Sequence, residues 1–415
     1  LFIAISTGKK EIINNKGVLM KKEFHGNFTQ QEPLSEEAIA AAIKVMRHGR
    51  LHRYNVVENE ASEVALLEQD FAKKFDVKFC LACASGGYAM TTALRALGIN
   101  SGDKILTNGF TLAPVPGSIA AAGGEVVFVE VNEELLIDFD DLEKKIKSSK
   151  SKILLLSHMR GHICNMDSLM SLCNSYKVRV IEDCAHTMGA KWDKKWSGKY
   201  GIIGCYSTQT YKHLNSGEGG ILITDDEKIM ARAIMLSGSY MLFDRHISGP
   251  DSEFFEDIKL NTPNCSGRMD NLRAAILRPQ LANLEQKCIG WNKRYDLIQK
   301  ELKGTKGLRL IQRHPKEHFV ASSFQFLLPS LTSEAIKEFL ISCAEKGVEL
   351  KWFGAKEPTG FTSRYSSWQY APKQKLVNTE TILDGLIDMR LPLTFSITDC
   401  KIIAKIIKSE VRKLT

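Results

Sequence analysis

Apolar runs with the character of β-strands alternate with helical patterns over about 160 residues in the middle of this chain. A parallel sheet produces such an alternation, because each crossover between parallel strands is usually a helix that covers one face of the sheet. We therefore predict a doubly wound α/β domain with a mostly parallel sheet near residues 60–260. The expected strands lie in FCLACA (79–84), KILTN (104–108), EVVFVEV (125–131), SKILLLSH (151–158), VRVIED (178–183), IIGCYS (202–207) and GILITD (220–225).

Helical patterns flank this region on both sides. Residues 35–49 predict a helix that Ser35 caps and Gly49 ends, and residues 269–287 predict one long helix. From about residue 288 the strand and helix signals are mixed, which favours a smaller α+β domain. The expected organisation is an N-terminal extension over 1–34, poorly ordered over 1–19, then a large α/β domain over 35–287 and a small C-terminal domain over 288–415.

The charge of the chain is modest and scattered, with a formal net value of +8. Its one dense basic run is the end, 401–415, where Ile402, Ile403, Ile406 and Val411 share a helical face. We interpret this run as a core-facing amphipathic helix, not as a nucleic-acid or membrane-binding segment. No apolar stretch approaches the ~20 residues of a membrane span, and no export signal is expected at the start. The positive balance suits a small anionic substrate.

The ten cysteines are too few for a disulfide scaffold, and most lie in apolar strand-like runs. They favour a reducing compartment, and we expect a cytoplasmic protein. Cys80 and Cys83 form a CxxC pair, but no second pair or histidine cluster follows at zinc spacing. The pair is expected to be buried core, and no metal site is predicted.

Residues just beyond the strands are the candidate site, because ligands of open α/β sheets bind at the carboxyl ends of the strands. Ser85, Gly86 and Gly87 follow the first expected strand and open a helix. Free N–H groups at a helix start attract an anion such as phosphate. By itself the same tripeptide is also typical of a simple tight turn.

Glu182 and Asp183 end another expected strand, with His186 three residues after Asp183. A carboxylate in that place can pair with the protonated ring nitrogen that pyridoxal phosphate (PLP) needs as an electron sink. Taken alone, the pair could equally cap the following segment.

Lys212 follows the strand IIGCYS, five residues after Ser207. An amine near a phosphate-binding serine and a pyridinium carboxylate can form a Schiff base with a carbonyl cofactor. A P-loop does not fit, because a Walker lysine follows its glycines, whereas Lys212 precedes Gly217, Gly219 and Gly220. Those glycines are expected to let the backbone turn into the next strand.

Taken in order, Ser-Gly-Gly, EDCAH, S-x-Q-x-x-K and GEGG resemble the DegT/DnrJ/EryC1/StrS family of PLP-dependent sugar aminotransferases. The resemblance is clear over residues 35–285, including ALRALGINSGDKIL, GGEVVFVEV, HMRGHICNMD and GRMDNLRAAI, and looser through LPLTFSITD in the small domain. It implies a fold-type-I aminotransferase sheet, PLP as cofactor and a homodimer whose active sites take groups from both chains.

The resemblance also implies roles for individual residues. Lys212 resembles the Schiff-base lysine, and Asp183 resembles the partner of the pyridinium nitrogen. His186 stands where the family has glutamine or histidine near the ring hydroxyl of the cofactor. The remaining residues implied in cofactor binding are Ser85, Gly86, Gly87, Ser207 and Gln209.

Several positions depart from the family pattern. Leu112 follows Thr111 where an aromatic residue often stacks on the pyridoxal ring, and Gln209 replaces a common histidine. Ser266, two residues before Arg268, replaces the asparagine that usually reaches across the dimer. We name Ser266 and Arg268 as candidate substrate residues.

The segment GRLHRYNVVENEAS, residues 49–62, departs from the usual substrate entrance of the family. Together with the net positive charge, its His52 and Arg53 suggest a negatively charged acceptor, with Arg53 as a candidate anchor for phosphate or carboxylate. The altered entrance gives weight to an acceptor without a nucleotide.

Three functions follow. The first is transfer of an amino group from L-glutamate to a keto-sugar, either nucleotide-linked or the 8-keto form of 3-deoxy-octulosonate, for cell-surface polysaccharide or lipopolysaccharide biosynthesis. The second is a sugar dehydratase of the same family, against which Lys212 argues because those enzymes have histidine there, although His213 is adjacent. The third is a non-catalytic regulator on the same fold, whose sign would be loss of the lysine or the carboxylate.

Overall fold

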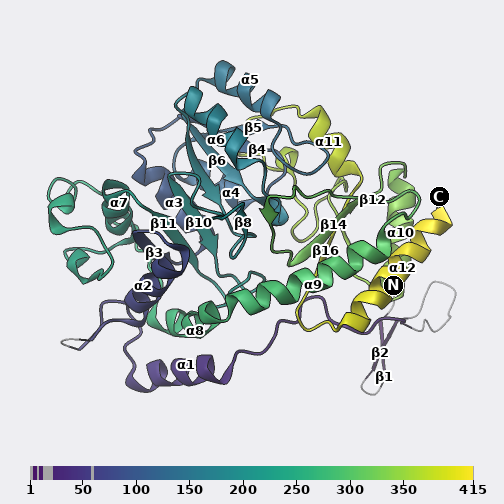
Figure 1. Ribbon diagram of the computed structural model, residues 1–415, viewed down its shortest axis with the longest axis horizontal. Helices are drawn as coiled ribbons and strands as arrows, with labels where there is room; N and C mark the ends of the chain where they lie inside the picture. Colours follow the sequence, from purple (N-terminus) through teal and green to yellow (C-terminus); the bar gives the residue numbers. More distant parts are fainter. Residues whose placement is uncertain (1–2, 7–8, 13–21, 58–59, 415) are drawn as a thin grey trace.

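The computed structural model describes residues 3–6, 9–12, 22–57 and 60–414. Its centre is a seven-stranded sheet in the order β3-β11-β10-β7-β6-β4-β5 (Figure 1). The pairs from β10 to β5 are parallel, whereas β11 is antiparallel to both β10 and β3. The strands are β3 (Phe79–Cys83), β4 (Lys104–Asn108), β5 (Glu125–Val129), β6 (Ile153–Ser157), β7 (Arg179–Asp183), β10 (Ile203–Ser207) and β11 (Gly220–Thr224). The predicted doubly wound, mostly parallel sheet is confirmed.

The reversed direction of β11 has a local cause. No helix lies between β10 and β11, so the chain returns through residues 208–219 and enters the sheet in the opposite sense. Lys212 lies on this return. Gly217 and Gly219 have φ angles of 80° and 154°, which side chains disfavour, so the glycines make the turn as predicted.

Helices cover both faces of the sheet, as the alternation predicted (Figure 1). One buried cluster joins the sheet to α2, α5 and α6, and a second joins its other face to α3, α4 and α7. Cys80 belongs to the first cluster and Cys83 to the second, so the two thiols point to opposite faces and are buried core residues. The helices are α2 (Glu63–Phe75), α3 (Gly86–Ala96), α4 (Pro114–Ala121), α5 (Phe139–Ser149), α6 (Met166–Ser175) and α7 (Glu227–Ser237).

Helix α1 (Glu36–His48) starts and ends where the sequence predicted. Ser35 accepts a hydrogen bond from the N–H of Ala38, and Gly49 closes the helix with a φ of 73°. The predicted long helix after residue 269 was wrong in one respect. It is two helices, α8 (Asn271–Ala282) and α9 (Leu284–Leu302), which join at Asn283. Helix α9 continues from the large sheet to the C-terminal part of the molecule (Figure 1).

The C-terminal part is built on a second, four-stranded sheet in the order β12-β14-β16-β15. Helix α12 packs on α9 and α10, and its buried face includes Ile403, Ile406 and Val411, which confirms the interpretation of the basic run as a core-facing helix. The elements are β12 (Arg309–Leu310), β14 (Ser323–Leu327), α10 (Ser333–Glu345), β15 (Lys351–Trp352), α11 (Val377–Asp384), β16 (Leu386–Arg390) and α12 (Ile397–Leu414).

Contacts cross the proposed domain boundary at residue 287, which lies inside α9. In a small sheet, β13 (Glu317–His318) pairs with β8 (Lys191–Trp192), which pairs with β9 (Lys195–Trp196). The division into two domains therefore remains a proposal. The other elements are the hairpin β1 (Ile3–Ser6) and β2 (Lys9–Ile12) and the 3-10 helices η1 (Met159–Gly161), η2 (Phe243–Arg245), η3 (Ser252–Phe255) and η4 (Tyr365–Ser367).

Part of the predicted N-terminal extension, residues 1–2, 7–8 and 13–21, lies outside the described residues. Among the helices of the described chain, none has the length and apolar character that crossing a bilayer requires.

Candidate active site

A cavity of about 480 Å³ lies at the carboxyl ends of the central strands. Its wall on the large sheet is formed by the first turn of α3, the return loop 208–219 and residues that follow β6 and β7. Its wall on the C-terminal side is formed by residues of β14, β16 and the loop 360–363. The cavity brings together seven residues that the sequence predicted: Ser85, Gly86, Gly87, His186, Ser207, Gln209 and Lys212.

The start of α3 forms a cradle for an anion. Ser85 caps the helix, its Oγ accepting a hydrogen bond from the N–H of Tyr88 at 3.1 Å. Gly86 and Gly87 occupy the first positions of α3, where amide N–H groups have no partner inside the helix. Gly86 also packs against Ser207, since a Cβ at Gly86 would lie 2.9 Å from the Cβ of Ser207. A side chain at Gly86 would therefore force the two halves of the cradle apart.

The loop that carries Lys212 is held by its own hydrogen bonds. Ser207 Oγ accepts the N–H of Gln209 at 3.3 Å, and Gln209 Oε1 accepts the N–H of Tyr211 at 3.0 Å. The N–H of Lys212 bonds to the carbonyl of Gln209 at 2.8 Å. The side chain of Gln209 thus shapes the turn that directs the lysine into the cavity.

Asp183 ends β7 beneath the cavity and is 6% exposed. Its Oδ2 accepts the hydroxyl of Ser157 at 2.9 Å, and its Oδ1 accepts the N–H of Ala185 at 3.1 Å. The hydroxyl of Thr111 lies 2.8 Å from Ser157 Oγ, and Asn108 holds the backbone of Ser157 from β4. The carboxylate is therefore oriented by residues from the ends of two neighbouring strands.

Glu182, next to Asp183, points to the other face of the strand and has a structural task. It is fully buried and accepts the N–H groups of Gly198, Tyr200 and Gly201 as well as His158 Nε2 at 3.0 Å. Burial alone would raise its pKa, but His158 and the backbone donors hold the pKa below its usual value. Of the two acidic residues at this strand end, Asp183 is the one whose charge raises the pKa of Lys212, although Asp183 itself is not among the residues that line the cavity.

His186 contacts the functional amine of Lys212 directly, with His186 Nε2 2.8 Å from Lys212 Nζ. On the other side of the ring, Nδ1 faces the backbone N–H of Arg160 at 3.4 Å and must accept from it. A neutral imidazole whose Nδ1 accepts carries its proton on Nε2. His186 then donates to Nζ, which requires a neutral lysine amine.

Electrostatics support the neutral amine. Burial, the positive charge of Arg160 and that of Arg390 lower the pKa of Lys212 to about 7, against the opposing effect of Asp183. Burial and the charges of Lys212 and Arg160 also lower the pKa of His186 well below its usual value. At pH 7 the imidazole of His186 is therefore neutral, and a substantial fraction of the Lys212 amine is neutral too, which is the state in which a lysine is a nucleophile.

Arg53 is not brought to this cavity. It is 2% exposed and makes two hydrogen bonds to Glu68, at 2.9 and 2.8 Å, while its Nη2 also lies 3.2 Å from His246 Nδ1. Both terminal nitrogens of this guanidinium are therefore engaged, and only Nε lacks a hydrogen-bond partner. The prediction of Arg53 as an anchor is not supported at this cavity, because the side chain is buried and paired with Glu68.

Ser266 and Arg268 also lie away from the cavity. Ser266 is exposed with a φ of 49°, and Arg268 donates to the carbonyl of Gly238 at 2.7 Å. His213 is buried with its ring 5.1 Å from that of Trp291 and lines a different cavity, and burial lowers its pKa to about 3. Lys212, and not His213, faces the cradle.

Sequence reasoning missed several residues of the site. Asn108 and Ser157 end expected strands and could have been found by the same rule that found Asp183. Arg160, Tyr211 and Arg390 line the cavity too. Arg390 comes from the C-terminal sheet, 178 positions from Lys212, and carried no local signal.

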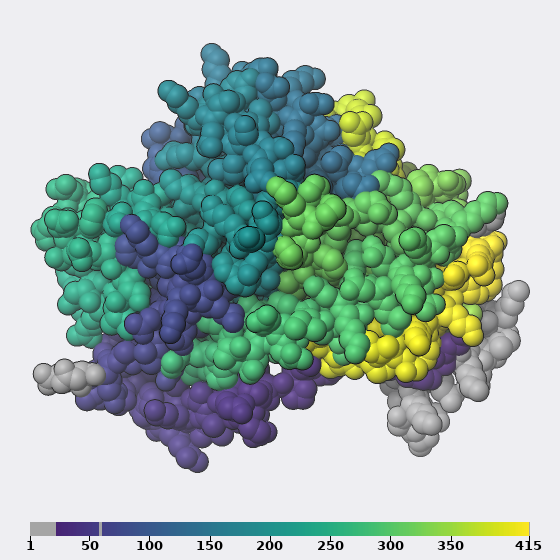
Figure 2. Space-filling view, viewed as in Figure 1, coloured from purple at the N-terminus to yellow at the C-terminus, as the bar shows by residue number. Residues whose placement is uncertain are grey.

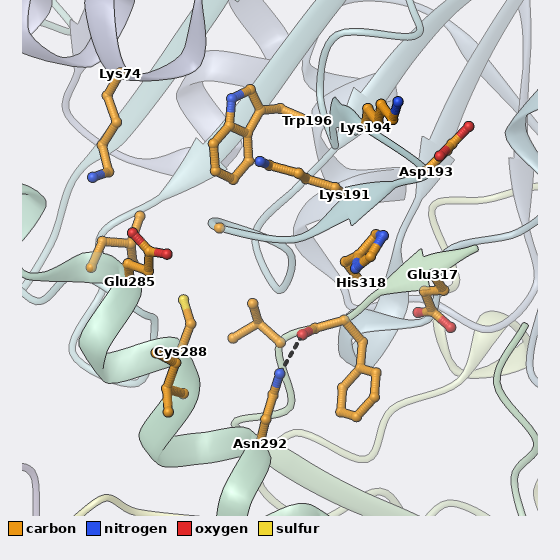
Figure 3. Close-up of a pocket in the computed structure, with 15 residues that line it drawn as sticks. Lys74, Lys191, Asp193, Lys194, Trp196, Glu285, Cys288, Asn292, Glu317 and His318 are labelled. Atoms are coloured by element: carbon orange, nitrogen blue, oxygen red, sulfur yellow. Dashed lines mark hydrogen bonds between the residues drawn. The ribbon is translucent and has the colours of Figure 1, made fainter. Parts of the chain in front are cut away.

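A larger cavity, about 840 Å³, lies elsewhere, between α2, the β8–β9 hairpin and the first turns of α9. Figure 3 shows its charged side chains spread around an open space, with Asn292 donating to the carbonyl of Phe319. Lysines and acidic residues both line it, and none of the predicted site residues does. The candidate site is therefore chosen here not by size but by the convergence of Lys212, His186 and the start of α3 in one cavity.

The fold and the site define a class of protein. The molecule has the fold-type-I PLP aminotransferase fold, with a seven-stranded sheet that contains one reversed strand, a smaller C-terminal sheet and a lysine on the return loop. The sequence pattern of the DegT/DnrJ/EryC1/StrS aminotransferase family matches residues 33–408, so the chain belongs to this family, whose members use PLP.

Similar proteins agree on the family and the fold. The chain is 30% identical to the pleiotropic regulatory protein of Geobacillus stearothermophilus over 261 residues, which are 62% of this chain and 64% of that protein. It is 27% identical to GDP-perosamine synthase of Escherichia coli O157:H7 over 296 residues, 71% of this chain and 77% of that one. PseC of Helicobacter pylori, an aminotransferase involved in pseudoaminic acid biosynthesis, has the same fold, with a TM-score of 0.80 at 18% identity, covering 94% of this chain and all of PseC.

Proposed function

We propose that this protein is a PLP-dependent aminotransferase that moves an amino group from L-glutamate to a keto-sugar. The observation that carries the proposal is the amine of Lys212, 2.8 Å from His186 Nε2 and with its pKa lowered to about 7, in a cavity that also contains an anion cradle. Neither a regulator nor a structural protein needs a buried lysine in that state.

The residues of the cavity fit each part of PLP. The N–H groups at Gly86 and Gly87, with Ser85 and Ser207, would hold the phosphate, because the lack of a side chain at Gly86 lets the start of α3 lie close to Ser207. Asp183, anchored by Ser157, would pair with the ring nitrogen. When bound, PLP supplies the electron sink that lets an amino group pass between donor and acceptor.

The chain itself supplies nucleophile and proton transfer. The Nζ amine of Lys212 would attach the cofactor and, when free of it, would be placed to accept and return a proton within the cavity. His186 Nε2, 2.8 Å from Nζ, holds the amine in place. Residues of the C-terminal sheet form one wall of the cavity and would reduce the access of water to the reacting groups.

The acceptor is proposed to be negatively charged, a nucleotide-linked keto-sugar or the 8-keto form of 3-deoxy-octulosonate, in a cell-surface polysaccharide or lipopolysaccharide pathway. The guanidinium groups of Arg160 and Arg390, which line the cavity, support an anionic substrate. GDP-perosamine synthase, a relative of this chain, is named for a nucleotide sugar.

We propose a homodimer with shared active sites, in which Ser266 and Arg268 serve the site of the partner chain. Both residues lie outside the cavity of their own chain, and Ser266 is exposed. Helix α1 offers further support, because three apolar side chains lie uncovered on its outer face.

The test of the first proposal is chemical. Borohydride reduction after loading with PLP is expected to place a pyridoxyl group on Lys212, found by peptide mapping, and a keto-sugar is expected to accept the amino group from glutamate-treated protein. A pyridoxyl group on another lysine would remove the assignment of Lys212. If only simple keto acids accept the amino group, the assignment of a keto-sugar as acceptor is wrong.

One observation favours a second function: the relative from Geobacillus stearothermophilus is named a regulatory protein. A non-catalytic regulator would bind PLP or a sugar without turnover. The intact Lys212, Asp183 and His186 speak for catalysis, and measured amino transfer separates the two. A dehydratase is disfavoured, because Lys212, and not the adjacent His213, lines the cavity that contains the cradle.

A further inference from the structure

Arg390, the last residue of β16, reaches the cavity from the C-terminal sheet. Its guanidinium carbon lies 3.5 Å from the centre of the Tyr211 ring and 5.2 Å from that of Phe361. Tyr211 neighbours Lys212 on the return loop, and Phe361 comes from the loop after β15. Three separate segments therefore meet to position this side chain.

The aromatic contacts leave the hydrogen-bonding edge of Arg390 free. A guanidinium that stacks on a ring contacts it through its flat face, so its N–H groups, which lie in the plane, remain available. Within the described part of the chain, the Arg390 side chain has no hydrogen bond and no carboxylate partner. Such a fork matches the two oxygens of a carboxylate.

The second arginine of the cavity already has an ion-pair partner, although its Nε and Nη2 make no hydrogen bond within the described residues. Arg160 Nη2 lies 2.8 Å from Asp388 Oδ2, and Asp388 is fully buried. Asp183 is oriented beneath the cavity by Ser157. The two buried carboxylates of the neighbourhood therefore have other partners, and neither neutralises Arg390.

A further cation strengthens the field around Arg390. The ammonium of Lys351 is buried without a hydrogen-bond partner among the described residues. Burial, with Arg160 and Arg390 opposing the effect of Asp388, lowers the pKa of Lys351 to about 8. The region around Arg390 thus carries a surplus of positive charge that an anionic ligand would relieve.

We infer that Arg390 is the carboxylate anchor of this cavity: its free N–H edge binds the carboxylate of the substrate whose amino or keto group faces Lys212. The inference rests on the proposed function and deepens it. Donor and acceptor enter the same cavity in turn, so one anchor can serve the carboxylate of an amino acid and that of a sugar acid. The anchor favours an acceptor that is itself a carboxylic acid.

The experiment compares Arg390→Gln and Arg390→Lys with Arg412→Gln, a control at an exposed position near the end of α12. Binding of glutarate, a dicarboxylate without an amino group, is measured by calorimetry on protein freed of PLP. Loss of a charged partner is expected to weaken binding at least tenfold in Arg390→Gln. Arg390→Lys keeps the charge but loses the fork and is expected to be intermediate. The control should bind as the unchanged protein does.

A second measurement identifies the source of the carboxylate. On PLP-loaded protein, a raised KM of Arg390→Gln for glutamate assigns the anchor to the donor, and a raised KM for a keto-sugar acid, with a matched neutral keto-sugar unaffected, assigns it to the acceptor. Either result supports the inference. Unchanged glutarate binding, or an equal loss for acidic and neutral sugars, overturns it.

Failure of the proposed function would look different. If the unchanged protein does not attach PLP to Lys212, the aminotransferase proposal fails, whatever Arg390 does. The calorimetry with glutarate needs no PLP and still reports on the anchor.

Discussion

At Lys212, burial and the charges of Arg160 and Arg390 outweigh the nearby carboxylate of Asp183, so the pKa falls from 10.5 to about 7. In an unfolded chain the lysine keeps its ordinary pKa and stays protonated up to about 10.4. Between these values the unfolded state binds more protons than the folded state, so this group makes stability rise with pH.

Because Lys212 makes the stability of the protein rise with pH, the effect of Lys212→Met on stability depends on pH. Near pH 7 and below, the variant gains stability relative to the unchanged protein, because it no longer buries a charge. The gain shrinks as pH rises from 7 towards 10.5. Urea unfolding of both proteins without PLP, at several pH values, measures the difference, and a constant difference would mean that the lysine keeps its ordinary pKa.

Asp183→Asn is expected to retain PLP and to lose amino transfer. An amide no longer favours the protonated ring nitrogen, and each pKa unit of lost proton affinity corresponds to roughly 1.4 kcal/mol, or tenfold. Ser157→Ala, which removes only the hydrogen bond to Asp183 Oδ2, is expected to show a smaller loss. Stopped-flow rates with glutamate measure both. Near-normal rates in Asp183→Asn would make the carboxylate structural.

At the scale of the element, the first turn of α3 is proposed to bind the cofactor and also packs closely against Ser207. A Cβ at Gly86 would lie 2.9 Å from Ser207 Cβ, whereas one at Gly87 would come no closer than 3.8 Å to any atom. The two neighbouring glycines therefore have different tasks: close approach at Gly86, and access to the helix N–H groups at both.

Alanine at the two positions is expected to act in opposite directions on the protein without PLP. Gly86→Ala should lose about 1–3 kcal/mol of unfolding free energy from overpacking. Gly87→Ala should gain up to about 1 kcal/mol, because alanine favours helix over glycine. Denaturant unfolding compares them, and PLP titration should show weaker binding for Gly86→Ala. Equal stability of the two variants would refute the close packing.

At the scale of the whole molecule, helix α1 has more apolar surface than its own chain covers. Ala38, Ala42 and Val45 are buried, the helix packing on α8, while the outer face leaves Ile39, Ile43 and Met46 exposed by 37%, 37% and 56%. Helix α1 lies at the edge of the molecule, beyond α8 (Figures 1 and 2). An apolar stripe of this kind is typical of a protein interface.

Ile43→Lys is therefore expected to shift the proposed homodimer towards monomer and to weaken activity with it, because a charge placed in a buried interface must be desolvated. Lys44→Glu, on the same helix at an exposed position, is the matched control and should leave assembly nearly unchanged. Sedimentation velocity measures both. A stable, fully active monomer of the unchanged protein would contradict the dimer.

Local signals in the sequence were sufficient for the architecture and for most of the residues proposed to bind the cofactor. The alternation of strand and helix, the cap at Ser35 and the core face of α12 depend on neighbours a few residues apart, as do the ends of β7 and β10 that place Asp183 and Lys212. The break between α8 and α9 at Asn283 depends on finer geometry. The helical periodicity of the sequence continues across it, so the sequence predicted one helix.

Which arginine can be proposed to face a substrate was decided by tertiary structure alone. Arg53 looked available in the sequence, yet Glu68, fifteen residues on, claims it in a buried pair. Arg390 carried no local mark, yet packing of the C-terminal sheet brings it onto Tyr211 beside Lys212. Whether an arginine is free or paired depends on residues far away in the chain, and only the folded molecule determines which of them become its neighbours.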